Sequence, residues 1–150
     1  MSISVALHAL AAVIWVGGMF FAHVLLRPSV AELAAADRLA LWRRVLGRFF
    51  PWVLGCIAVL LITGYAGLLG LGGFAGAGMH VHIMQLTGWI MFLLFLHLYF
   101  APWRRFQKAV ADGAMEEAGR QLATIRKVVG INLVLGLLTV AIGASGRFWG

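Results

Sequence analysis

The stretch LHALAAVIWVGGMFFAHVLLRP, residues 7–28, decides how this chain folds. It is almost entirely apolar, and it is long enough for the roughly 20 residues that a helix needs to cross a bilayer core. The whole chain is 63% hydrophobic and 11% charged, about half the charged fraction of a soluble domain. We therefore predict one all-α integral membrane domain over residues 1–150, a four-transmembrane-helix bundle. The expected spans are residues 3–26, 51–71, 81–101 and 128–144.

Basic residues are concentrated in the two connectors, residues 27–50 and 102–127. Five of the 12 lysines and arginines fall in the first connector and six in the second. With four spans, both connectors lie on one side, and the positive-inside rule makes that side cytoplasmic. We expect a protein of the bacterial inner membrane with both termini outside (N-out/C-out). Because the basic residues flank spans, they predict attraction to lipid headgroups and no binding of nucleic acid.

The connectors also carry apolar residues. In residues 27–50 these alternate with charged ones at roughly helical spacing, which suggests a helix lying in the membrane interface. Residues 106–125 are similar but more polar. A solvated connector is the alternative interpretation of both segments.

The third run, VHIMQLTGWIMFLLFLHLYFAP (residues 81–102), repeats the first. Both follow the pattern H-x6-W-x7-H-x4-P. The pattern indicates an up-down helix pair that has been duplicated, a parallel repeat related by an axis along the membrane normal. Its residues are His8, Trp15, His23 and Pro28 in the first copy, and His82, Trp89, His97 and Pro102 in the second.

Histidine within a membrane span is costly and usually faces the bundle interior or a cavity. His8 and His23 are fifteen residues apart, an axial rise of about 22 Å. In a parallel repeat, His8 lies level with His82 near the outer surface, and His23 level with His97 near the inner one. Each layer then offers one imidazole from each repeat, as bis-histidine ligation of haem b requires. We predict one or two haems; hydrogen-bonded packing histidines are the alternative.

Trp15 and Trp89 would lie between the two layers, near the bundle axis and beside the cofactor, with plain packing as the alternative. All five acidic residues lie in the connectors, which argues against a proton pump or a carboxylate-coupled transporter. The prediction is therefore electron transfer or haem-dependent redox chemistry with an unidentified redox partner or quinone. The sequence leaves open whether the protein is a haem-dependent membrane oxidoreductase.

His80 lies outside the repeat, in the sequence MHVHIM. Thioether and imidazole groups together favour copper, especially the reduced ion. A second hypothesis is therefore copper binding or transport at the outer face through Met79, His80, His82 and Met84, with His8 as a further ligand. His80 and His82 point to different sides of a helix, so they converge only if the helix begins after His80. A third hypothesis is an accessory subunit of a larger membrane complex or a homo-oligomer, with structural histidines.

Five short segments carry a family resemblance: Leu7-His8, Trp15–Phe21, Arg27-Pro28, His82–Gly88 and Asn132–Gly136. Together they resemble the membrane domains of copper resistance protein D (CopD-like proteins), over nearly the whole chain. This resemblance implies a role in copper uptake or tolerance.

The first helix, with a histidine seven residues before a tryptophan and a glycine three after it, is also similar to that of the HemJ-type protoporphyrinogen oxidases. These are four-span haem-b membrane proteins, so the similarity implies haem binding, with His8 as a ligand. The HemJ pattern has a lysine in its third helix. Here the only lysines are Lys108 and Lys127, both outside the expected spans, which argues against protoporphyrinogen oxidation.

Overall fold

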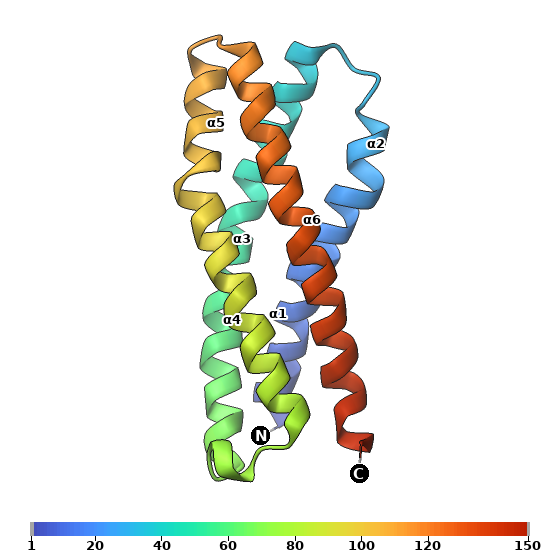
Figure 1. Ribbon diagram of the computed structural model, residues 1–150, viewed down its shortest axis with the longest axis vertical. Helices are drawn as coiled ribbons and strands as arrows, with labels where there is room; N and C mark the ends of the chain where they lie inside the picture. The colour runs from blue at the N-terminus through green and yellow to red at the C-terminus, as the bar shows by residue number, and fades with distance from the viewer. Residues whose placement is uncertain (1, 150) are drawn as a thin grey trace.

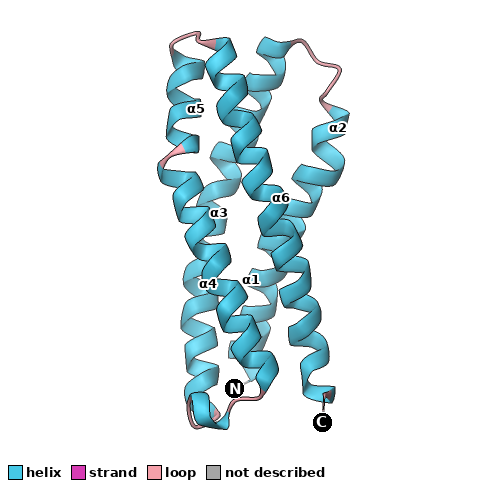
Figure 2. Cartoon of the chain, viewed as in Figure 1, coloured by secondary structure: helices cyan, strands magenta, loops and turns pink. Residues whose placement is uncertain are grey.

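A computed structural model describes residues 2–149 as helices joined by short turns, with no strand among these residues (Figures 1 and 2). Four helical rods are each long and apolar enough to cross a membrane, as predicted. They cover Ser2–Ser29, Ala35–Gly70, Met79–Ala111 and Met115–Phe148. The chain is thus a multi-pass membrane protein.

Each rod is built from one or more helices. The first holds α1 (Ser2–Phe20), a π-helical turn η1 (Phe21–Leu26) and α2 (Arg27–Ser29). The second is the single helix α3 (Ala35–Gly70), which contains Pro51. The remaining elements are a 3-10 turn η2 (Phe74–Gly76), α4 (Met79–Phe100), α5 (Pro102–Ala111), α6 (Met115–Ser145) and a 3-10 turn η3 (Gly146–Phe148).

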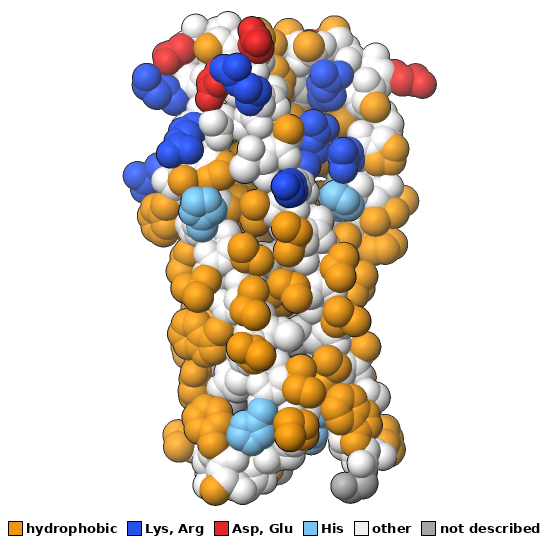
Figure 3. All heavy atoms as spheres, viewed as in Figure 1, with side chains coloured by type: hydrophobic (Ala, Val, Ile, Leu, Met, Phe, Trp, Pro, Cys, Tyr) orange, Lys and Arg blue, Asp and Glu red, His pale blue; other side chains and the backbone are white. Residues whose placement is uncertain are grey.

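The rods pack as the duplicated helix pair predicts. Helix α1 packs mainly along α3, and α4 mainly along α6. Both termini lie at one end of the bundle, and the turns that follow α2 and α5 lie at the other (Figure 1). Lysine, arginine and acidic side chains gather at the end away from the termini (Figure 3). We call the two ends the basic end and the terminal end.

The first connector differs from its expected position in the membrane interface. Residues 35–50 continue α3 without a break and pack inside an extension of the bundle. Their apolar stripe is Leu39, Trp42, Leu46 and Phe50, and the residues of α5 and α6 in the same core cluster include Trp103, Phe106, Leu122 and Ile125. The physical reason is that the second connector is amphipathic too. The two apolar faces therefore bury each other, with the rings of Phe50 and Trp103 edge-on at 5.0 Å.

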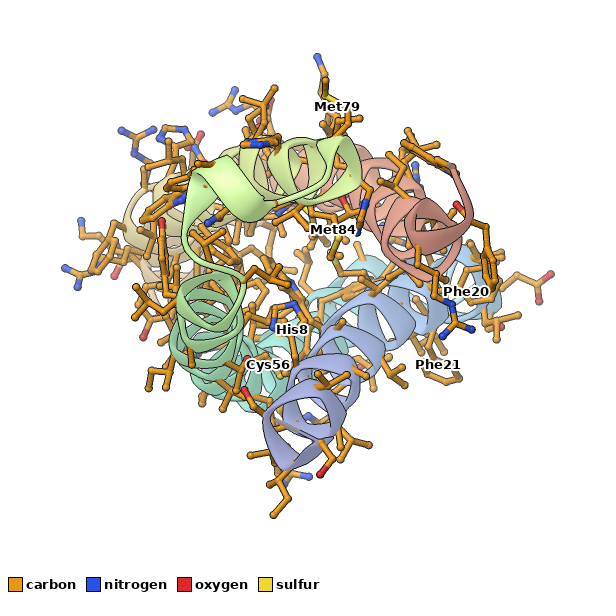
Figure 4. The ribbon with its side chains drawn as sticks, turned by 90° about the horizontal axis from the view of Figure 1, so that it is seen from below. His8, Phe20, Phe21, Cys56, Met79 and Met84 are labelled. Carbon is orange, nitrogen blue, oxygen red and sulfur yellow. The ribbon has the colours of Figure 1, made fainter. Side chains whose placement is uncertain are left out.

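Packing is uneven along the bundle. Within residues 2–10, 60–70, 79–88 and 137–149, which form the terminal half, only Thr63, Leu68 and Gly146 are buried. The remaining buried residues lie in the middle and toward the basic end. Seen from the terminal end, side chains, His8 and Met84 among them, lie between the four rods (Figure 4). The terminal half is thus the less deeply buried part of the described bundle.

Candidate functional site

His8 lies in the terminal half of α1, and its ring is directed toward the inside of the bundle (Figure 4). The ring is half-buried and packs on α3 at Gly64. A Cβ atom at residue 64 would come 3.3 Å from His8 Cε1. Glycine at that position therefore lets the imidazole lie directly against the neighbouring helix.

Hydrogen bonds fix the tautomer of His8. Its Nδ1 lies 2.8 Å from Thr63 Oγ1, and Thr63 Oγ1 donates its only proton to the backbone oxygen of Val59 at 2.6 Å. With that proton directed to Val59, Thr63 accepts from His8 and Nδ1 carries the imidazole proton. The lone pair of Nε2 is left available, which is the state in which histidine binds a metal.

Met84, on α4, is also directed toward the inside of the bundle (Figure 4). Its side chain lies against α6 at Gly143, where a Cβ atom would come 2.9 Å from Met84 Cε and 3.0 Å from Sδ. One turn deeper, Thr139 donates to Thr87 at 2.7 Å and ties the same two helices together. The terminal half thus presents an imidazole from one repeat and a thioether from the other.

Met79, His80 and His82, the other residues predicted for copper, have three different surroundings. Met79 is 69% exposed and points away from the bundle (Figure 4). His82 is exposed and stacks on Phe74 at 5.9 Å between ring centroids. His80 is half-buried, with its ring 6.4 Å from that of Trp149. Helix α4 begins at Met79, before His80, so the two histidines diverge as helical geometry requires.

Histidine side chains lie at two heights, one band below the basic side chains and one near the terminal end (Figure 3). In each predicted pair, however, the rings have different surroundings. His8 and His23 are half-buried, and His23 packs at Gly130 of α6, where a Cβ atom would come 3.0 Å from its Cε1. His82 and His97 are exposed. This arrangement gives bis-histidine ligation no support, and haem binding stays a prediction.

The two repeat tryptophans are not equivalent. Trp15 is 2% exposed and stacks on Phe92 at 5.7 Å, near the bundle axis as expected. Trp89 is 41% exposed, and its Nε1 donates to the hydroxyl of Tyr65 at 3.1 Å. The axial position expected for Trp89 is therefore wrong, because Phe92 and Phe95 of α4 already pack against Trp15 there.

Sequence reasoning missed the residues that shape the site. Thr63, Gly64 and Gly143 set the tautomer of His8 and the positions of both candidate ligands. A hydroxyl and two glycines in apolar helices were visible in the sequence, but nothing there indicated which helix each one faces. Among residues 2–149, no three His, Cys, Asp or Glu side chains gather as a metal site.

Comparison with known proteins shows which family the chain belongs to. The family model of copper resistance protein D matches residues 43–145. That segment contains Met84 but not His8, and it covers more than half of the chain. No curated protein and no solved structure matches the chain, and the HemJ-type resemblance stays an expectation. The chain belongs to the copper resistance protein D family.

Proposed function

We propose that this protein handles copper within the membrane and binds Cu(I) in the terminal half of the bundle through His8 Nε2 and Met84 Sδ. The observation that carries the proposal is the contact of His8 Nδ1 with the Thr63 hydroxyl, which favours the tautomer whose Nε2 is free to bind a metal. Membership of the copper resistance protein D family supports it. Its biological role would be copper uptake or tolerance.

The donor chemistry favours a soft ion. Thioether and imidazole ligands suit Cu(I), whereas Mg²⁺, Ca²⁺ and Mn²⁺ prefer carboxylate and carbonyl oxygens. All five acidic residues lie in the predicted connectors and none in the terminal half. Two protein ligands, one imidazole and one thioether, leave coordination positions open, which suits a site that receives copper and passes it on.

The orientation that we propose for the protein in the membrane follows from the distribution of its charged residues. The basic end carries 11 of the 12 lysines and arginines, so it would face the cytoplasm of a bacterium. The copper site would then open to the outside of the inner membrane.

Copper content of the purified protein tests the proposal. We expect protein from copper-supplemented cells to retain copper through gel filtration, and both His8→Ala and Met84→Ala to lose most of it. Met79→Ala and His82→Ala are matched controls from the same end of the bundle, and we expect them to retain copper. Equal retention by all four variants would contradict the site.

Haem b is the second candidate, and the same free Nε2 of His8 is the observation that favours it. The partner predicted for it does not fit, since His82 is exposed and stacked on Phe74, so no haem-dependent step follows from the geometry. An absorption spectrum separates the candidates. A b-type spectrum after dithionite reduction would favour haem, and a colourless protein that binds neither group would favour an accessory subunit.

A further inference from the structure

A groove lies at the basic end, on the side of the bundle where the first rod meets α6. Its volume is about 660 Å³. One part of its wall is basic, formed by Arg27, Arg126 and Lys127 together with His23. The adjoining part is apolar and includes Ile131 and Val134. The groove is thus amphipathic, with its basic part toward the end of the bundle and its apolar part toward the spans.

Local helix geometry creates this groove. His23 lies in the π-helical turn η1, which joins α1 to α2. Such turns interrupt α-helices mostly as single bulges and are frequent at functional sites. On the facing helix, Gly130 has no side chain and lets the His23 ring approach α6. The turn and the glycine therefore bring Arg27 and Arg126 to the same groove.

The positive charges of the groove lack a negative partner. The three ion pairs formed within residues 2–149 join Lys108 to Asp112, and Arg120 to Glu116 and to Glu117. None of them includes a residue of the groove. Arg27 and Arg126 line the same groove, so their like charges repel each other. A bound anion would relieve this repulsion.

Two buried N–H groups beside the groove also need a hydrogen-bond acceptor. A small cavity of about 20 Å³ adjoins the groove, sharing His23, Arg27 and Arg126 with it, and Trp42 lines this cavity as well. The Nε1 atom of Trp42 and the Nε atom of Arg126 are both buried without a hydrogen-bond acceptor among the described residues. Buried donors normally have an acceptor, so an anion's oxygen atoms or a water would complete the site.

The apolar wall distinguishes a lipid from a soluble anion. Ile131 and Val134 are 45% and 58% exposed, and they continue the groove along α6 toward the spans. A free phosphate would leave this surface uncovered, whereas an acyl chain would cover it. Basic pockets between membrane helices at the cytoplasmic side are suited to anionic lipid headgroups.

We propose that this groove binds an anionic phospholipid, with its phosphodiester held by Arg27, Arg126 and Lys127 and one acyl chain along Ile131 and Val134. Arginine suits this task because its planar guanidinium binds phosphate oxygens in a bidentate manner. The site is independent of the proposed copper centre, which lies at the opposite end of the bundle.

Native mass spectrometry of the full-length protein in detergent tests the proposal. Phosphatidylglycerol and phosphatidylcholine with the same acyl chains are titrated separately. We expect phosphatidylglycerol to bind more tightly. The double variant Arg27→Gln/Lys127→Gln should weaken its binding by roughly 30-fold, since each basic residue near a lipid surface contributes about fivefold. Both side chains are exposed, so the variant should fold.

The matched control is Arg104→Gln/Arg105→Gln, which removes the same charge from exposed residues of α5 outside the groove. We expect it to bind phosphatidylglycerol as the wild type does. Equal loss in both double variants would indicate diffuse attraction to the basic end and overturn the site. Equal affinity for the two lipids would also overturn it.

A third experiment distinguishes a bound lipid from a bound soluble anion. Inorganic phosphate is added to the lipid complex, and we expect it to leave the lipid bound because the acyl chain contributes to affinity. The variant Ile131→Ala/Val134→Ala should weaken binding of phosphatidylglycerol. Complete displacement by phosphate, with no effect of the apolar variant, would assign the groove to a soluble anion and overturn the proposal.

Discussion

His8 of α1 and Thr63 of α3 are joined by a hydrogen bond between their side chains. The two atoms, Nδ1 and Oγ1, are 2.8 Å apart, and the threonine hydroxyl also lies 2.6 Å from Val59 O, to which it donates. Histidine ligands of metals usually donate their second nitrogen to such a partner, which sets the tautomer and the orientation of the ring. Thr63 is therefore a positioning residue in the proposed copper site.

The first prediction is that Thr63→Val weakens copper binding. Valine keeps the volume of threonine but cannot accept from Nδ1, so His8 would no longer be held in one tautomer. Loss of such a partner typically costs about 10–100-fold in metal affinity. Competition with a coloured Cu(I) chelator measures the affinity. Thr63→Ser keeps the hydroxyl and should stay close to the wild type, and equal affinities for the two variants would exclude the positioning role.

The second prediction concerns Gly143. An alanine there would place a Cβ atom 2.9 Å from the end of the Met84 side chain, and that flexible side chain would have to move. We expect Gly143→Ala to lower Cu(I) affinity while the melting temperature stays the same or rises, because alanine favours a helix by about 1 kcal/mol over glycine. Gly67→Ala, in a helix position with open space around it, is the control. A copper affinity that Gly143→Ala leaves unchanged would remove Met84 from the site.

The spans were predictable from the sequence because hydrophobic length alone determines them. The course of residues 35–50 was not. Their amphipathic pattern shows that one face is buried but not whether lipid or protein covers it. In the structure, α5 and the first turns of α6 cover that face, and this depends on how the two connectors meet in space.

The candidate site was predictable only in part. His8 was identified from the repeat, and the two heights of the histidines follow from the rise of a helix. The direction in which each ring points depends on the rotation of each helix about its axis, which packing determines. The π-helical turn at Phe21–Leu26 makes the direction of the His23 ring harder to predict, because it changes the rotation of His23 about the helix axis relative to His8. No clear pattern in the sequence indicates this turn.

The third prediction is that Asn132 stabilises the bundle. Its side-chain Nδ2 donates to the backbone oxygen of Met91 at 3.1 Å, and the residue is 2% exposed. This bond joins α6 to α4. We expect Asn132→Ala to lower the free energy of unfolding by about 1–2 kcal/mol, since interhelical bonds in membranes contribute roughly 0.6–1.7 kcal/mol and a small void is added. Thermal unfolding in detergent measures the effect. Val134→Ala, on the exposed side of α6, should change stability less; an equal change would show that the bond contributes nothing.

The fourth prediction concerns the orientation of the protein in the membrane. Ala75 lies in the turn at the terminal end and Ala114 in the turn at the basic end, and both are exposed. In a Cys56→Ser background, Ala75→Cys should react with a membrane-impermeant maleimide in intact spheroplasts. Ala114→Cys should react only after the membrane is permeabilised, because we expect the basic end to face the cytoplasm. The opposite pattern would place the His8 and Met84 site on the cytoplasmic side and make it an exit site for copper rather than an entry site. Labelling of both residues in intact spheroplasts would contradict a single orientation.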